Sequence, residues 1–308
     1  MLSPSKRTFS NRVPRPTTRR FIRAVPLCVS GWAYLDDMPP DLTGSRIKVQ
    51  RAKEQFRDFI TRAQDFLNLN PYGVVIEDDP QTGERIWRAR VSRPVPPEWS
   101  PLIGDIVHNL RAALDYVAWQ LEAANGTRVD PRSIQFPVWN RGAPAPTTAG
   151  AVKDHQAKRK RQEHAFGLLA MALIERLQPD SRRNRDWMLS PLWLLHLLDI
   201  EDKHRLLVVV GGTVVNALTT IGGPGQDVHI ESMSIGSPGM SVVPIADGTE
   251  LMRLKLGADT PNVDVKQTFT AFVAFEKLGP GQGKPVLETL DQLIGFVDQT
   301  LTLFAALP

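Results

Sequence analysis

The stretch GDIVHNLRAALDYVAWQLE, residues 104–122, is the most regularly patterned part of this sequence. Its apolar residues recur every three or four positions, and at about 100° per residue they fall on one broad face of a helix. That face consists of Ile106, Val107, Leu110, Ala113, Leu114, Val117, Ala118 and Leu121. The spacing therefore predicts an amphipathic helix that buries this face against other helices.

The other side of this predicted helix carries polar and aromatic residues in two stripes. The first contains His108, Arg111, Asp115, Trp119 and Glu122, and the second contains Asp105, Asn109, Tyr116 and Gln120. Arg111 and Asp115 are four positions apart and can form an ion pair, and His108 can reach either of them. Because such pairs are common on exposed helices, two interpretations stay open: a solvated or interface-facing side, and an active surface.

A second segment of similar character is LWLLHLLDIEDKHR, residues 192–205. Ser190 is suited to the N-cap and Pro191 to the first turn, which predicts a helix from there to about residue 204. This helix is apolar nearly all round, so most of its surface should be buried. A helical wheel separates two sets: His204 falls with Trp193, Leu197 and Ile200, whereas His196, Asp199 and Lys203 form a line of their own.

Titratable groups on a buried helix need partners, because an unpaired buried charge is costly. These groups can pair with one another or with the polar stripe of residues 104–122. Three alternatives follow: a satisfied structural network, a functional site built from both helices, and a surface-exposed helix end. The candidate site residues are Arg111, His204, His108, Asp202 and Asp115.

The segments around these two helices predict further elements. Residues 41–68 have the pattern of a long amphipathic helix, and residues 73–91 that of a β-hairpin with DPQTGE as its turn. IQFPVW, residues 134–139, reads as a short extended piece, followed by a flexible loop at 140–151. A basic, solvated helix is predicted to begin at residues 152–164, and the apolar residues 165–179 are also helical in pattern.

From residue 206 onward the pattern changes to strand-like runs separated by Gly, Pro and Asp, and residues 284–307 form a final amphipathic helix. The runs predict a mostly antiparallel sheet of four or five strands. The fold class is therefore α+β, with about four helices and a hairpin insertion before the sheet. We expect a tail at 1–40, a helical domain at 41–205 and a sheet with a C-terminal helix at 206–308; the last two parts can also be one domain.

Composition narrows the class of protein. Of the 308 residues 42% are hydrophobic and 23% charged, as in soluble globular proteins, and no apolar run is long enough for a membrane span. The single cysteine, Cys28, leaves no intrachain disulfide framework and favours the cytoplasm. The sequence predicts no metal and no cofactor, because it lacks HExxH, CxxC and P-loop motifs, and it also lacks the GxSxG motif of serine hydrolases. A metal set of His108, Asp105, Asp202 and His204 can be drawn, but no local spacing requires it.

The net charge of +4 is concentrated at the N-terminus, where residues 1–35 hold seven basic residues and no acidic ones. The remaining 30 basic and 33 acidic residues give the rest of the chain a charge of −3, which weakens any argument for nucleic-acid binding from charge alone. Three interpretations of the basic segment stay open: a disordered tail or a start codon assigned too early, an anchor for RNA or membrane, and a cleaved signal.

The two polar helices also carry a resemblance. GDIVHNLRAALDYVAWQL and LLDIEDKHRLL, with FPVW and IERLQPD between them, resemble a broad set of bacterial proteins that share the pattern "hNLRsALDhl … niDKHr". The likeness covers about residues 45–210. It implies membership but no activity, since no reaction is established for that set.

A second resemblance is to the HEPN superfamily of helical proteins, which includes metal-independent ribonucleases with an arginine and, four to six residues later, a histidine. Here the arginine corresponds to Arg111 and the histidine position falls on Tyr116. Tyrosine, with an ordinary pKa near 10, is a poor general base at neutral pH. The resemblance therefore implies RNA cleavage only if His108 or His204 transfers the proton, and the sheet after residue 206 is not part of a minimal HEPN bundle.

Two classes of function follow. In the first, the protein is a non-catalytic binding or interaction protein, and the Arg111/Asp115 and Asp202/His204 groups hold helices together or face a partner. In the second, it is a metal-independent ribonuclease in which Arg111 stabilises the phosphorane charge, His204 or His108 is the acid/base, and Asp202 or Asp115 orients the histidine. An RNA or protein partner fits either class. The long helices at 42–68 and 284–307 suit a homodimer as well as packing within one chain.

Overall fold

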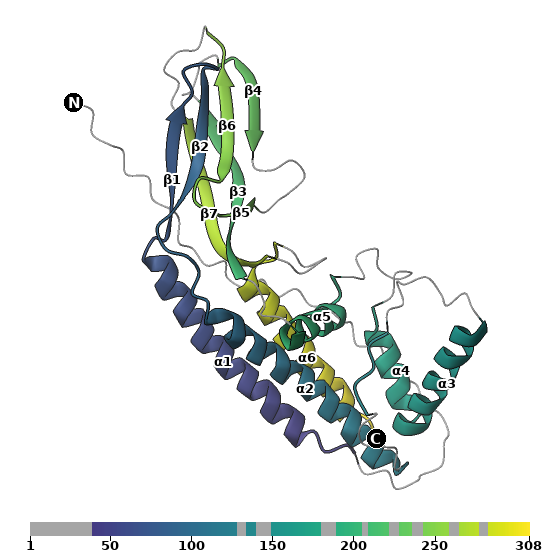
Figure 1. Cartoon of the computed structure of the whole chain (residues 1–308). Helices are drawn as coiled ribbons and strands as arrows, with labels where there is room; N and C mark the ends of the chain where they lie inside the picture. Colours follow the sequence, from purple (N-terminus) through teal and green to yellow (C-terminus); the bar gives the residue numbers. More distant parts are fainter. Residues whose placement is uncertain are drawn as a thin grey trace. The chain divides into compact units, whose positions relative to one another are not determined.

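The computed structural model describes residues 39–127, 134–139, 149–179, 189–204, 209–221, 228–235, 243–258, 265–276 and 283–308. Within these ranges the chain forms six helices and seven strands, which confirms the predicted α+β fold class (Figure 1). The chain divides into two compact units. We call the described residues within 58–100 and 207–287 the sheet unit, and those within 15–57, 101–206 and 288–308 the helical unit.

The helices follow the apolar periodicity of the sequence. They are α1 (Thr43–Asn68), α2 (Trp99–Asn125), α3 (Ala149–Phe166), α4 (Leu168–Leu177), α5 (Pro191–His204) and α6 (Val286–Ala305). The predicted start of α5 is confirmed, because Ser190 Oγ accepts a bond from the Trp193 amide at 3.4 Å and the Ser190 carbonyl accepts one from Leu194. The helical run predicted at 165–179 is interrupted at Gly167, whose φ of 75° lies in the left-handed region.

The core of the helical unit is built from the faces that the sequence predicted to be apolar. All eight apolar positions on the predicted face of α2 are buried. Leu192, Leu195 and Leu198 of α5 are also buried, as are Leu293 and Phe304 of α6. Polar links add to this packing: Asn109 of α2 donates to Gln55 of α1 and accepts from Lys48. The titratable groups of α2 and α5 are therefore carried by well-packed helices.

The sheet unit contains two antiparallel sheets. Its strands are β1 (Tyr72–Asp78), β2 (Glu84–Val91), β3 (Val209–Ile221), β4 (Ile230–Ile235), β5 (Val243–Pro244), β6 (Glu250–Leu256) and β7 (Val265–Phe275). One sheet has the order β1-β2-β6-β4 and the other β5-β3-β7, where a single sheet had been expected. A buried cluster that includes Trp87, Met252 and Val265 contains residues of both sheets.

The two units group the elements differently from the division expected at residue 206. The hairpin β1–β2 is confirmed as a hairpin, but β2 pairs with β6 over Glu84–Arg88, so the hairpin belongs to the sheet unit. Most of the C-terminal helix α6 belongs to the helical unit instead. The predicted tail, through residue 38, and the loop at 140–148 lie outside the described residues.

Candidate functional site

Most of the candidate residues lie on α2 and α5 in the helical unit. His108, Arg111 and Asp115 occupy successive turns of α2, and Asp202 lies in the last turn of α5. The structure describes the backbone of His204 but not its side chain, so the hypothesis that Arg111 and His204 belong to one functional site lies outside the described residues. Arg111 and Asp115 form one group, His108 belongs to a second group centred on Asp199, and Asp202 lies against Gly104.

Arg111 is the centre of a closed set of hydrogen bonds. Its Nη2 donates to Asp115 Oδ1 at 2.9 Å and to the carbonyl oxygen of Phe136 at 2.9 Å. The Phe136 amide donates to the same Asp115 oxygen, also at 2.9 Å. The guanidinium and the carboxylate together therefore hold the backbone of residues 134–139 against α2.

This arrangement buries Arg111, which is only 6% exposed. Its Nη1 atom is buried too and has no hydrogen-bond partner among the described residues. Burial raises the pKa of Asp115, while the Arg111 charge and the Phe136 amide act in the opposite direction. The expected solvated or interface-facing stripe of α2 is thus exposed only in part: Arg111 and Glu122 are buried, whereas His108 and Trp119 are exposed.

The second group is centred on Asp199 of α5, a residue that is 3% exposed. Its Oδ2 accepts a bond from Lys203 Nζ at 2.6 Å, and its Oδ1 lies 3.4 Å from His108 Nδ1. The His108 side chain is 56% exposed, so a buried carboxylate is next to an accessible imidazole. This arrangement orients a histidine in the way that general acid/base groups are oriented.

The carboxylate of Asp202 lies against Gly104 in the first part of α2. A Cβ atom at position 104 would lie 1.9 Å from Asp202 Oδ1. Burial raises the pKa of Asp202, with Asp105 and Asp199 acting in the same direction. Glycine at position 104 therefore permits α5 to place a carboxylate directly on α2.

His196 lies one turn before Asp199 and is half-buried. Burial lowers its pKa, and the Arg111 charge lowers it further, so the neutral imidazole is favoured in the folded state. Its ring centre is 5.6 Å from that of Trp193. These contacts fit a histidine that packs within the helical unit.

Tyr116 occupies the position where the HEPN pattern has a histidine. Its side chain is 46% exposed, and its ring packs close to Gly44 at the start of α1, where a Cβ atom would lie 3.0 Å from Cδ2 of the ring. Among the described residues no His, Cys, Asp and Glu side chains form a group of three that could hold a metal ion.

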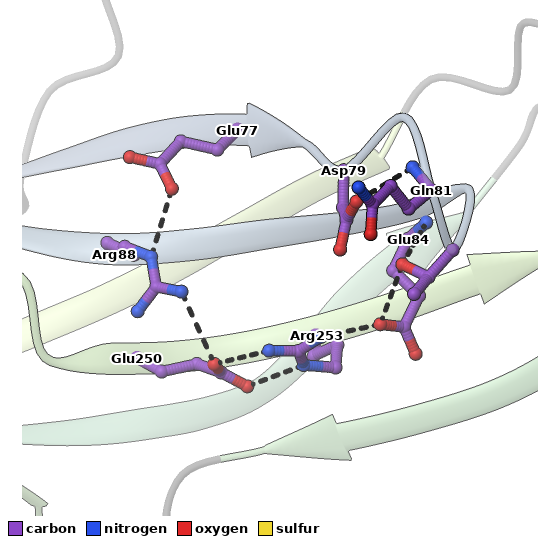
Figure 2. A network of polar contacts seen from close by, with 8 residues as sticks. Glu77, Asp79, Gln81, Glu84, Arg88, Glu250 and Arg253 are labelled. Atoms are coloured by element: carbon purple, nitrogen blue, oxygen red, sulfur yellow. Dashed lines mark hydrogen bonds and ion pairs between the residues drawn. The ribbon is translucent and has the colours of Figure 1, made fainter.

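The sheet unit has a charged network of its own, drawn in Figure 2. Arg253 of β6 bonds to Glu250 and to Glu84 of β2, and Arg88 of β2 bonds to Glu77 of β1. The hydrogen bonds from Arg253 lower the pKa of Glu250. Every cation here faces carboxylates on a partly exposed sheet surface, which fits a solvated face better than a reactive site.

Sequence reasoning missed three sets of contacts in these groups: those of His108 with Asp199, of the Phe136 backbone, and of Gln178. Asp199 and Lys203 were recognised as a line on α5, but nothing in the pattern assigned His108 to Asp199. The backbone of Phe136 gave no signal, because peptide groups are present in every residue. Gln178, which is 5% exposed, accepts from the Trp139 amide and donates to the Pro137 carbonyl, so it holds residues 134–139 from the side of α4.

Comparison with known proteins finds no matching family model, no similar curated protein and no similar solved structure. Of the helices within the described ranges, none combines the length and apolar character needed to cross a membrane.

Proposed function

We propose that this protein is a non-catalytic binding or interaction protein, and that the polar groups of α2 and α5 hold its helical unit together. The observation that carries the proposal is the enclosure of Arg111. Its guanidinium is buried and bonded to a carboxylate and a backbone carbonyl, both from its own chain. These bonds occupy the face through which Nη2 would otherwise bind a phosphate.

The test compares stability with turnover. Arg111→Ala leaves Asp115 and the Phe136 carbonyl without their shared donor, so we expect the free energy of unfolding to fall by about 2–5 kcal/mol. Arg51→Ala is the matched control, because the Arg51 side chain is 63% exposed and its removal should cost less than about 1 kcal/mol. Both values come from denaturant unfolding of the purified protein.

The same preparations are assayed for cleavage of single-stranded and structured RNA in the presence of EDTA. We expect no turnover by the wild-type protein. Turnover that disappears in Arg111→Ala while the free energy of unfolding is unchanged would reverse the assignment of Arg111 from structure to catalysis.

A second candidate function is metal-independent RNA cleavage, the activity implied by the resemblance to HEPN proteins. It is favoured by the exposed imidazole of His108 beside the buried carboxylate of Asp199. In this alternative His108 transfers the proton, Asp199 orients the ring, and the Lys203 ammonium group, which is bonded to Asp199, supplies a positive charge.

This alternative has its own pair of variants. If RNA is cleaved, His108→Ala should remove the activity without changing the melting temperature, since the side chain is largely exposed. His164→Ala, which alters an exposed histidine on α3, should leave the rate unchanged. Equal rates in the two variants would exclude His108 as the acid/base group.

A further inference from the structure

The short helix α4 has apolar side chains on both of its sides. Ala170, Met171 and Ile174 are buried, while Leu168 and Leu169 are 80% and 49% exposed. Leu168 is the most exposed of the large hydrophobic residues in the described ranges. Neighbouring apolar side chains left exposed in this way are typical of an interaction surface.

The junction before these leucines is held in place. Asn125, the last residue of α2, donates through Nδ2 to the carbonyl oxygen of His164 at 2.6 Å and to that of Ala165 at 3.3 Å. Ala165 and Phe166 are buried, and Gly167 supplies the left-handed turn between α3 and α4. The exposed leucines therefore follow a hydrogen-bonded junction between two helices and do not lie at a frayed helix end.

The neighbouring helix α3 is basic. It contains five basic and two acidic residues, a net charge of +3, whereas the chain beyond residue 35 without α3 has a net charge of −6. Arg159 points toward α4, because it pairs with Glu163 and with Glu175. The exposed Lys158, Lys160 and Arg161 form no ion pair with any carboxylate in the described residues.

Lys158, Lys160 and Arg161 flank the side of α3 that meets α4. At about 100° per residue, Lys158 and Lys160 lie on opposite sides of Arg159, and Arg161 lies behind it. Whichever flank of the hairpin carries Leu168 and Leu169, a lysine lies on that flank as well. Because Arg159 pairs with Glu175, these cations are level with Glu175, about two helical turns along α4 from Leu168. A flat surface that covers the leucines and extends along the hairpin therefore also meets positive charge.

We propose that the α3–α4 hairpin docks on an anionic phospholipid surface, with Leu168 and Leu169 entering the acyl boundary and the α3 cations contacting the headgroups. Apolar insertion beside basic residues is the combination by which peripheral proteins bind such surfaces. A nucleic acid offers phosphates but no aliphatic layer to cover the leucines. A second copy placed symmetrically on this face would bring two basic helices together. The inference rests on the proposed function, because it names the partner of a binding protein.

The test is co-sedimentation of the full chain with vesicles of phosphatidylcholine alone and of phosphatidylcholine mixed with phosphatidylglycerol. We expect binding to the anionic vesicles only, decreasing as salt is added. Leu168→Ser/Leu169→Ser and Lys158→Gln/Lys160→Gln/Arg161→Gln should each weaken this binding by about tenfold or more. All variants retain residues 1–35, so the seven basic residues of that segment contribute equally throughout.

Matched controls change the same chemistry elsewhere. Arg46→Gln/Arg51→Gln/Arg93→Gln removes three exposed charges from α1 and the segment before α2, and Ile47→Ser removes an apolar side chain that is 63% exposed. Both controls should bind vesicles like the wild type. Circular dichroism melts establish that each variant is folded.

Four outcomes would overturn the proposal. The first two are no binding of the folded protein to anionic vesicles, and equal losses of vesicle binding in the α3–α4 variants and their controls. The other two are binding of RNA, without vesicle binding, that the α3–α4 substitutions abolish, and a dimer in solution that Leu168→Ser/Leu169→Ser dissociates. Cleavage of RNA would instead overturn the proposed function and leave the vesicle result unchanged. The two failures are therefore distinguishable.

Discussion

The carboxylate of Asp202 occupies the space that a side chain at Gly104 would need. The atoms involved are Asp202 Oδ1 and Cγ, which would lie 1.9 Å and 2.5 Å from a Cβ atom at position 104. This contact brings α5 close to the first part of α2, within the helical unit. It limits which side chains positions 104 and 202 can accept.

The first prediction is that Gly104→Ala destabilises the protein. The added methyl group forces Asp202 or the helix backbone to move, which we expect to cost about 1–3 kcal/mol in the free energy of unfolding. Gly295→Ala is the control: Gly295 is also helical, but a Cβ atom there would meet nothing within 4 Å, so that change should stabilise by about 0.5–1 kcal/mol. Chemical denaturation measures both. If the double variant Gly104→Ala/Asp202→Ala recovers no stability, the Asp202 contact is not the cause.

The second prediction concerns pH. Because burial raises the pKa of Asp202 above its ordinary value of 3.8, the ionised carboxylate costs stability at neutral pH, and this cost disappears as the pH falls through the raised pKa toward 3.8. Asp202→Asn should therefore be more stable than the wild type at pH 7. The difference should shrink on acidification, and melts across this range would measure it. A difference that grows as the pH falls would contradict the assigned direction of the shift.

Gln178 gives the third prediction. Its amide group bonds to the Pro137 and Ile174 carbonyls and to the Trp139 amide, so Gln178→Leu leaves buried backbone groups without a partner. The expected loss in the free energy of unfolding is about 1–3 kcal/mol. Gln50→Leu removes only an exposed bond to Glu54 and should have little effect. Similar losses in the two variants would mean that residues 134–139 do not depend on Gln178.

The fourth prediction is a substitution that should not lower the free energy of unfolding. Tyr72 is 4% exposed, and its hydroxyl has no hydrogen-bond partner among the described residues. Burial raises the pKa of this hydroxyl to about 12. Tyr72→Phe removes an unsatisfied polar group and keeps the ring against Phe66, so stability should be unchanged or higher. A loss of more than about 1 kcal/mol would reveal a partner for the hydroxyl.

Local sequence patterns predicted most of the fold because helix and strand periods are local. The eight apolar positions of α2, the Ser190 cap of α5 and the hairpin at residues 73–91 are all visible within a few turns or one strand pair. The pairing of β2 with β6 was not, since more than a hundred residues separate Trp87 from Met252, and neither strand specifies its neighbour.

The candidate site shows the same limit. Sequence spacing anticipated the Arg111–Asp115 pair, which depends only on one helix. It did not anticipate that residues 134–139 cover Arg111, because that depends on a loop connection and on backbone atoms. The assignment of His108 to Asp199 required two helices to be placed against each other, which no periodicity supplies.

The hydrogen bonds that hold residues 134–139 have a consequence for how the sequence of this chain can evolve. The helices bind the main-chain atoms of Phe136, Pro137 and Trp139. The side chains of Phe136 and Pro137 are buried, and the Phe136 ring packs against Phe304. Gln135 is exposed and Val138 half-buried, so we expect substitutions at these two positions to have little effect on stability. Substitutions of Arg111, Asp115 or Gln178 would remove the hydrogen bonds that hold the segment. In a collection of descendants of this sequence, the holding residues should vary less than the segment that they hold.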